Sequence, residues 1–179
     1  KIILAKSAGY CFGVRDAVNA AYDVSKEHGE VYMLGDIVHN ESVVDDLEKK
    51  GVKVVENLEE IPEDKPVLFR AHGTSKDVWK KAEDKKMNII DATCPLVHDI
   101  HREVKELHAE GRKIIIIGDH GHDEVIGIAS QVEGALIIAS IEEAQKLRKT
   151  KKAGIVSQST QAIENVQDII NILMTKVVD

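Results

Sequence analysis

The sequence predicts an α/β protein made of two small domains, each with a parallel sheet. Short β-branched segments alternate with longer segments of helical period, which is typical of βα units around a parallel sheet. This alternation starts again after Cys94, where Pro95 suits the first turn of a helix. We therefore expect a first domain over residues 1–93 and a second domain over residues 94–179.

The expected strands are short runs rich in Val and Ile. They cover residues 2–5, 31–34, 52–55, 67–70, 88–91, 113–117, 135–138 and 153–156. The expected helices cover residues 14–28, 42–50, 76–86, 96–110, 124–131, 141–147 and 161–174. The last helix is well marked, because Ile163, Val166, Ile170 and Leu173 repeat on one face.

The composition limits the class of function. The chain has 179 residues, of which 43% are hydrophobic, and its aliphatic runs are far shorter than the ~20 residues of a membrane span. A formal net charge of -7 and few aromatic residues make nucleic acid an unexpected partner. Because no signal-peptide pattern opens the sequence and two cysteines make no disulfide framework, we expect a reducing, cytoplasmic compartment.

Cysteine, histidine and other polar residues that a hydrophobic core does not need recur in the loops that follow the expected strands. In parallel α/β sheets ligands bind outside the carboxyl ends of the strands, so these loops predict a common pocket. The loops cover residues 6–13, 35–40, 70–74, 91–95, 118–124 and 157–160. They carry Cys11, His39, His72, Cys94, His122, Glu124, Ser159 and Thr160.

The two cysteines have several possible roles. A lone cysteine is most often a small buried hydrophobe. However, Cys11 lies between Gly9 and Gly13, and Cys94 precedes Pro95 at a helix start, where the helix N-terminus favours a thiolate. On the residues alone, metal ligation, a redox disulfide and a nucleophilic thiol all stay open.

The histidines fall into two groups. His39, His72 and His122 lie in loops after strands, where imidazoles and helix N-termini can hold an anion such as a diphosphate. The alternative is three unrelated loop or cap histidines. The others lie within helical periodicity among charged residues, which predicts solvated helix faces, and they are His28, His98, His101 and His108.

Two further polar sites also allow more than one interpretation. Glu124 opens a helix, where a carboxylate is often only a partner of the helix dipole, but with His122 it could also form a proton-donating pair. Ser159 and Thr160 could belong to an N-cap of the last helix or supply hydroxyls to the pocket. No dinucleotide-binding or P-loop motif is present.

Several of these stretches together resemble the LytB family of hydroxymethylbutenyl diphosphate reductases, which act last in the non-mevalonate isoprenoid pathway. The stretches run in the family's order across nearly the whole chain, and they are Ala8–Val14, Ile37–Asn40, Arg70–Gly73, Asp91–Val97 and Gly121–Gly127. The resemblance implies a trefoil of three α/β domains around a central four-iron, four-sulfur cluster. Cys11 and Cys94 would be two of its three thiolate ligands.

The resemblance also implies roles for the other loop residues. His39, His72 and His122 would bind the substrate diphosphate, with Ser159 or Thr160 supplying a hydroxyl. Glu124 and His122 would deliver protons. The reaction would be reductive loss of an allylic hydroxyl, giving isopentenyl and dimethylallyl diphosphates, with electrons from a ferredoxin or flavodoxin type donor.

The sequence departs from the family pattern in two respects. No residue matches the family's third cysteine, the chain begins without Met, and it ends at Asp179 with no closing strand expected, so we expect a fragment without the third domain. Such a fragment would not hold an intact cluster, and residues 1–10 are also candidates for that absent domain. The family has Gln-Thr-Thr where this chain has Gln158, Ser159 and Thr160, which keeps the hydroxyl.

Two other functions compete with this interpretation. One is a zinc-dependent hydrolase that uses His120 and His122 together with His39 and His72, since the spacing of His120 and His122 permits shared ligation. The other is a non-catalytic phosphate-binding module, which needs no metal.

Overall fold

The structure is a computed structural model that describes residues 2–6 and 9–178. The chain divides into two compact units, residues 1–71 with 82–95 and residues 72–81 with 96–179, and each unit has its own parallel sheet. No helix in the described part of the chain is long and apolar enough to span a bilayer.

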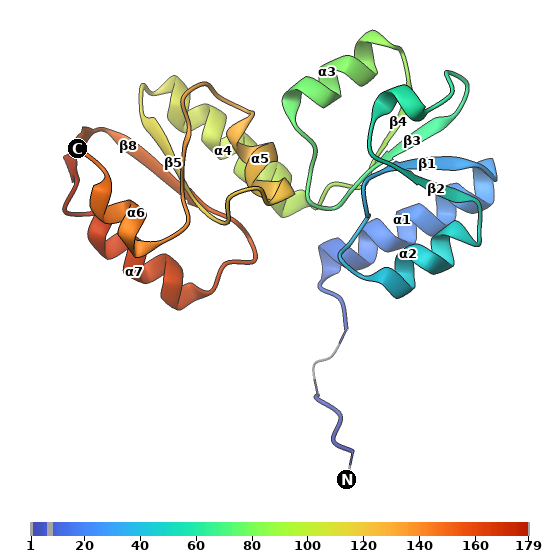
Figure 1. The fold of residues 1–179 in the computed structure, drawn as a ribbon, viewed down its shortest axis with the longest axis horizontal. Coiled ribbons are helices and arrows are strands. Elements are labelled where there is room, and N and C mark those ends of the chain that lie inside the picture. Colours follow the sequence, from blue (N-terminus) through green and yellow to red (C-terminus); the bar gives the residue numbers. More distant parts are fainter. Residues whose placement is uncertain (1, 7–8, 179) are drawn as a thin grey trace. The chain divides into compact units, whose positions relative to one another are not determined.

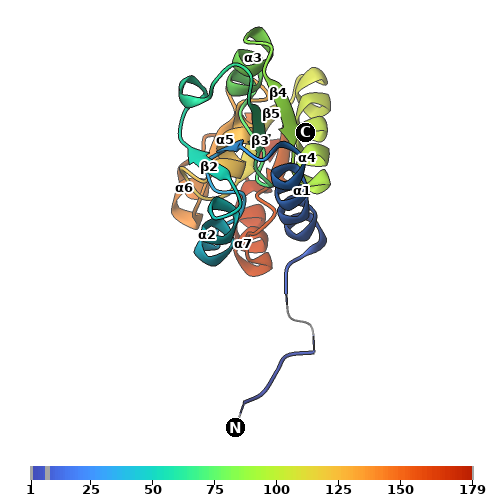
Figure 2. The ribbon, with the colours of Figure 1, turned by 90° about the vertical axis from the view of Figure 1, so that its right-hand side faces the viewer.

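The first unit contains a four-stranded parallel sheet in the order β2-β1-β3-β4 (Figure 1). Its strands are β1 (Val31–Leu34), β2 (Val52–Val55), β3 (Pro66–Phe69) and β4 (Asn88–Asp91). Helices α1 (Phe12–His28) and α2 (Glu41–Glu48) lie next to each other on one face of this sheet, as Figure 2 also shows. Because β3 pairs on the opposite side of β1 from β2, the loops after β1 and β3 flank the point where strand order reverses.

The core of the first unit follows from the alternation of side chains along each strand. Met33 of β1 and Leu68 of β3 are fully buried and pack with Ala21 of α1 and Leu47 of α2. Val67 and Phe69 alternate with Leu68 and are also fully buried, so both faces of β3 are covered. Leu58 of η1 (Leu58–Glu60) and Ala82 of α3 (Lys76–Asp84) are buried as well.

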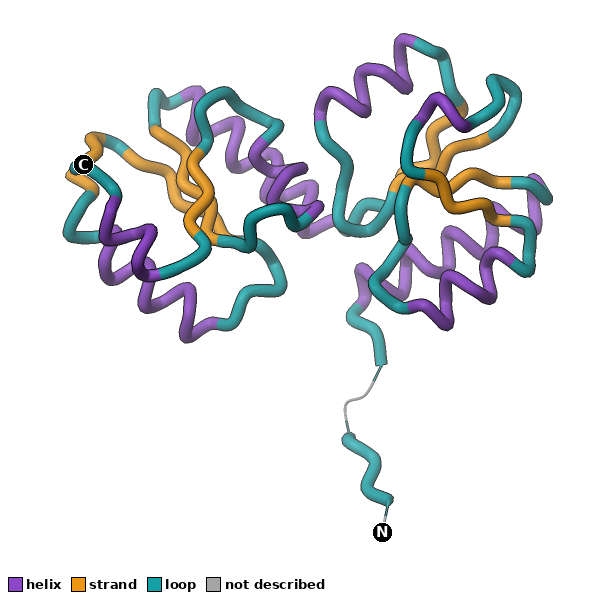
Figure 3. The backbone as a smooth tube through the Cα atoms, viewed as in Figure 1, coloured by secondary structure: helices purple, strands orange, loops and turns teal. Residues whose placement is uncertain are grey.

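The second unit contains a three-stranded parallel sheet in the order β6-β5-β8. Its strands are β5 (Lys113–Ile117), β6 (Leu136–Ile138) and β8 (Ala153–Ser157), and its helices are α4 (Pro95–Ala109), α5 (Asp123–Ala129), α6 (Ile141–Lys146) and α7 (Ile163–Leu173). Strands are drawn in orange and helices in purple in Figure 3.

The isoleucine run of β5 explains the layers of the second unit. Ile114 and Ile116 pack in the cluster that contains Val104 of α4 and Ile128 of α5. Ile115 and Ile117 pack on the opposite face, in a cluster with Ala144 of α6 and with Ile169 and Leu173 of α7. The strand is therefore apolar at successive positions because helices cover both faces of the sheet.

Most expected strands agree with the structure to within a residue, but the strand expected at residues 2–5 is wrong. Ile2, Ile3 and Leu4 have no regular structure and their exposed fractions are 93%, 78% and 88%. An apolar run becomes a strand only when another strand pairs with it, which the sequence pattern cannot show. The structure also adds β7 (Thr150–Lys151) and β9 (Val177–Val178), a short pair where no closing strand was expected.

Candidate functional site

Both cysteines lie in the first unit, each at the start of a helix. Cys11 is exposed and is the N-cap residue of α1, and Cys94 is half-buried and directly precedes α4. A Cβ atom added to Gly13 would lie 2.3 Å from the Cys94 Sγ atom. The Cys94 thiol therefore lies against the first turn of α1, the turn that Cys11 caps.

The loop that carries Cys94 is fixed by local hydrogen bonds. The Asp91 carboxylate, at the end of β4, accepts from the Thr93 backbone N–H at 3.0 Å, which is an Asx-turn contact. The Cys94 backbone N–H donates to the Ala71 carbonyl at 3.0 Å. The loop after β4 is thereby held beside the loop after β3, and the Cys94 thiol keeps its place at α1.

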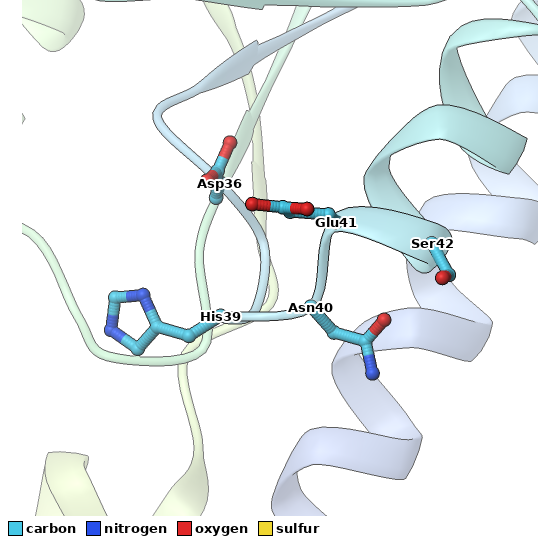
Figure 4. Close-up of a pocket in the computed structure, with 5 residues that line it drawn as sticks. All are labelled: Asp36, His39, Asn40, Glu41 and Ser42. Atoms are coloured by element: carbon cyan, nitrogen blue, oxygen red, sulfur yellow. The ribbon is translucent and has the colours of Figure 1, made fainter.

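His39 lies in the loop after β1 and is exposed. The next residue, Asn40, caps α2 by accepting from the Val43 N–H at 3.3 Å, and its amide donates to the Tyr10 hydroxyl at 3.1 Å. A pocket of about 550 Å³ is lined by Asp36, His39, Asn40, Glu41 and Ser42, and the His39 ring projects away from the Asn40 and Ser42 side chains (Figure 4). The contact with Tyr10 joins the His39 loop to the segment that precedes Cys11.

Among the described residues, Glu124 is the most buried polar residue of the second unit. It is only 1% exposed, and its carboxylate accepts from the Ser159 backbone N–H at 2.6 Å and from the Ser159 hydroxyl at 2.8 Å. A buried carboxylate is costly unless hydrogen bonds replace its water, and these two donors do so. The contact joins the start of α5 to the loop after β8.

Gln158 also ties the loops of the second unit together, although sequence reasoning gave it no site role. It is 3% exposed, its carbonyl oxygen accepts from the Asp119 N–H at 2.9 Å, and its amide donates to the Thr160 hydroxyl at 2.8 Å. The N-cap interpretation of Ser159 and Thr160 is wrong, because α7 is capped at Ala162 without a side-chain hydrogen bond. The available sequence signal was its place in the expected loop 157–160, directly before Ser159 and Thr160.

His122 and His72 lie close together in the second unit. The His122 Nδ1 atom caps α5 by accepting from the Glu124 N–H at 3.2 Å, so the neutral ring carries its proton on Nε2. The centroids of the His72 and His122 rings are 5.7 Å apart and the rings are nearly perpendicular. His122 is therefore a helix cap and also one of a pair of half-buried imidazoles.

His120 has a different neighbour from the one that the zinc interpretation requires. Its Nε2 atom lies 3.0 Å from each carboxylate oxygen of Glu143, a residue of α6. The Ala139 backbone N–H, and then His120, lower the pKa of Glu143. Among the residues that the structure describes, no three His, Cys, Asp or Glu side chains form a group suited to a metal ion.

One prediction about the remaining histidines is wrong. His101 is 8% exposed and lies in the interior, whereas His28, His98 and His108 are exposed as expected. The reason is local: Gly127 of α5 has no side chain, and the His101 ring fills that space, with Nε2 3.5 Å from the position of a Cβ on Gly127.

The structure thus divides the predicted site residues into two groups, one in each unit. Cys11, His39 and Cys94 belong to the first unit, and His72, His122, Glu124, Ser159 and Thr160 belong to the second. Within the second group, direct contacts join Glu124 to Ser159 and His72 to His122.

The known proteins of similar sequence all point to one family. A family model described as LytB protein matches residues 2–179. The 4-hydroxy-3-methylbut-2-enyl diphosphate reductase of Geotalea daltonii is 41% identical over 98% of this chain and 62% of its own length. The enzyme of that name from Clostridioides difficile is 40% identical over 98% of this chain and 64% of its own length.

Solved structures give the same result. The E-1-hydroxy-2-methyl-but-2-enyl-4-diphosphate reductase from Plasmodium falciparum matches with a TM-score of 0.89 and 30% identity, over 97% of this chain and 57% of its own. A structure of (E)-4-hydroxy-3-methyl-but-2-enyl diphosphate reductase, described as the terminal enzyme of the non-mevalonate pathway, matches with a TM-score of 0.82 and 34% identity. It is covered over 64% of its length, so the chain spans less than two thirds of these relatives.

Proposed function

Because this chain belongs to the LytB protein family, we propose that it forms two domains of a 4-hydroxy-3-methylbut-2-enyl diphosphate reductase. The observation that carries the proposal is the Cys94 thiol at the helix turn that Cys11 caps, in a chain that matches the family over residues 2–179. The reaction replaces the allylic hydroxyl by hydrogen. Two electrons and two protons are consumed, the hydroxyl leaves as water, and the products are isopentenyl and dimethylallyl diphosphates.

The two thiols fit a four-iron, four-sulfur cluster. Both lie at helix N-termini, and cysteine thiolates are the usual ligands of such clusters. Gly13 leaves the space in which the Cys94 Sγ atom sits beside α1. Cys11 and Cys94 would be two of the ligands, with a third thiolate from the part of the relatives that this chain does not span. When bound, the cluster supplies single electrons and Lewis-acidic iron.

The histidines supply the diphosphate-binding groups of the proposal. The neutral His122 ring carries its proton on Nε2, since Nδ1 accepts from α5, and it can donate that proton to a phosphate oxygen. His72 lies next to it, and His39 belongs to the corresponding loop of the first unit. Thr160 accepts from Gln158 and is exposed, so its own hydroxyl proton is available for the same anion.

Glu124 is the proposed proton donor, acting together with His122. Its buried carboxylate is oriented by the Ser159 N–H and hydroxyl, which fixes where a proton on that carboxyl would lie. The serine hydroxyl does this without the extra methyl group of a threonine. Ser159 therefore orients the proton donor, and Thr160 is the better candidate for the hydroxyl that meets substrate.

The rest of the proposal concerns the whole protein. A third α/β domain would complete a trefoil around the cluster, and residues 1–10 are candidates for membership in it. A ferredoxin or flavodoxin type protein would deliver electrons one at a time in the cytoplasm. A formal net charge of -7 gives the chain no general attraction for nucleic acid.

Anaerobic reconstitution tests the proposal on this chain and on the protein extended past Asp179 through the next cysteine. The extended protein is expected to bind iron and acid-labile sulfide, and to convert 4-hydroxy-3-methylbut-2-enyl diphosphate to the two products with reduced flavodoxin. This chain is expected to bind iron poorly. Zinc in a colourless, inactive extended protein would contradict the proposal and favour the hydrolase.

A further inference from the structure

A short segment that carries His72 is attached to the end of α5 by a hydrogen bond that the Ser130 hydroxyl accepts. We call residues 72–76 the His72 segment. The Lys76 backbone N–H, at the start of α3, donates to the Ser130 hydroxyl oxygen at 3.0 Å, and the Ser130 hydroxyl donates to the Gly127 carbonyl at 2.7 Å. The Gln131 side chain donates to the same carbonyl at 3.0 Å. The Ser130 hydroxyl therefore connects the His72 segment to the last turn of α5.

The other end of the segment lies directly against α5. A Cβ atom on Gly127 would lie 3.9 Å from the Gly73 carbonyl carbon and 3.5 Å from the His101 Nε2 atom. Gly73 and Thr74 are buried, and Gly73 has a φ of +82°, a conformation that glycine adopts without strain. The segment thus turns sharply after His72 and packs on the one residue of α5 that has no side chain.

We propose that Ser130 is a positioning residue that holds the His72 imidazole beside His122. The proposal rests on the proposed function, in which both imidazoles bind the diphosphate. Helix α5 starts at the His122 cap and ends at Ser130. It therefore presents one imidazole at its first turn and fixes, at its last turn, the segment that carries the other.

Loss of the Ser130 hydroxyl is expected to affect the position of the His72 segment more than the stability of the protein. The Lys76 N–H is one of the first-turn donors of α3 that no helical carbonyl satisfies, and it lies in an exposed hydrogen bond, so water can replace the lost acceptor. Water does not, however, connect the segment to α5. The His72 segment should then keep its fold and occupy a wider range of positions relative to His122.

The test compares Ser130→Ala with Ser140→Ala in the same chain. Ser140 is a matched control, because its hydroxyl accepts from the Glu143 N–H at the start of α6 and the same kind of bond is lost away from His72. Ser130→Thr retains the hydroxyl and serves as the rescue variant. The readouts are the nuclear Overhauser contact between the His72 and His122 ring protons and the dissociation constant for inorganic pyrophosphate by calorimetry.

Ser130→Ala is expected to weaken the contact between the two rings. It should also raise the pyrophosphate dissociation constant by about tenfold, the effect of losing one hydrogen bond between His72 and a phosphate oxygen. Ser140→Ala and Ser130→Thr should leave both values near wild type. An unchanged ring contact in Ser130→Ala would overturn the proposal. If the wild-type chain binds no pyrophosphate, the diphosphate assignment fails, and the ring contact alone still decides whether Ser130 positions His72.

Discussion

In the second unit Glu124 is almost fully buried and Ser159 donates two hydrogen bonds to it, whereas in the first unit Cys11 is exposed and makes no side-chain cap bond to α1. The same contrast holds for the histidines. His72 and His122 are half-buried and lie in contact, and His39 is exposed beside an open pocket.

This difference suits the two proposed tasks. A proton donor and an anion-binding pair work best when the protein itself fixes their geometry, as the loops after β5 and β8 do. Thiolate ligands of a cluster are held by their bonds to iron, so they must lie where the metal can reach them. The Cys94 thiol at the first turn of α1 supplies such a location.

The largest effect on stability is expected from Ser159→Ala in the second unit. The Glu124 carboxylate would lose the hydroxyl donor at 2.8 Å and keep only the backbone N–H. Loss of a hydrogen bond to a buried charged group costs about 1.5–3 kcal/mol in the free energy of unfolding, which urea denaturation measures. Ser159→Thr retains the hydroxyl and should cost far less. Equal losses in the two variants would contradict the contact.

A somewhat smaller effect is expected from Gly13→Ala in the first unit. The new Cβ atom would lie 2.3 Å from the Cys94 Sγ atom, so the thiol must move, at a cost of about 1–3 kcal/mol for overpacking. The matched control is Gly127→Ala in α5, where the nearest atom is 3.5 Å away and the helix gains up to about 1 kcal/mol in propensity. Equal stability of the two variants in urea denaturation would show that the Cys94 thiol does not fill this space.

Tyr22→Phe should reveal a pH-dependent contact between α1 and α2. The Tyr22 hydroxyl donates to the Asp46 carboxylate at 2.6 Å, and this bond raises the pKa of Tyr22 above its ordinary value of 10.0. A raised pKa gives stability that is complete below pH 10.0 and is lost as the pH rises through the pKa of the folded state. The variant is therefore expected to be less stable by about 1 kcal/mol near pH 7, and the difference should shrink in alkaline urea denaturation. A constant difference at every pH would contradict the assignment.

His120→Ala should have the smallest effect. The side chains of His120 and Glu143 are 56% and 37% exposed, and exposed pairs contribute less than about 1 kcal/mol. The lowered pKa of Glu143 stabilises the fold above the ordinary value of 4.5, and this stability is lost as the pH falls through the lowered pKa. In the variant the Glu143 carboxyl carbon should titrate at a higher pH by nuclear magnetic resonance. An unchanged titration would mean that His120 does not pair with Glu143 in solution.

Much of the fold could be predicted because the signals are local. β1, β2, β4 and β5 have the expected bounds, since β-branched runs flanked by turn residues mark buried strands well. Residues 2–5 have the same apolar pattern and form no strand. A strand also needs a second strand to pair with, and the local sequence does not show whether one is present. His101 was predicted to lie on a solvated helix face because its neighbours on α4 are charged. The ring in fact occupies the space beside Gly127, a contact that the sequence pattern does not reveal.

The site shows the same limit. The loops that carry Glu124, His122, Ser159 and Thr160 could be selected from their positions after expected strands. The sequence could not predict which hydroxyl contacts Glu124, because Glu124 and Ser159 are separated by 35 residues in the chain. The roles of Gln158 and Ser130 depend on similar long-range contacts, which neither periodicity nor a short motif encodes.

The most direct test of the account is the iron content of the anaerobically reconstituted extended protein, carrying Cys11→Ser, Cys94→Ser or His120→Ala. Each cysteine variant should lose most of its iron and acid-labile sulfide, and His120→Ala should retain the wild-type amount of both. Iron and sulfide that stay at the wild-type level in both cysteine variants would contradict the assignment of the thiols, and with it the proposed function of the first unit.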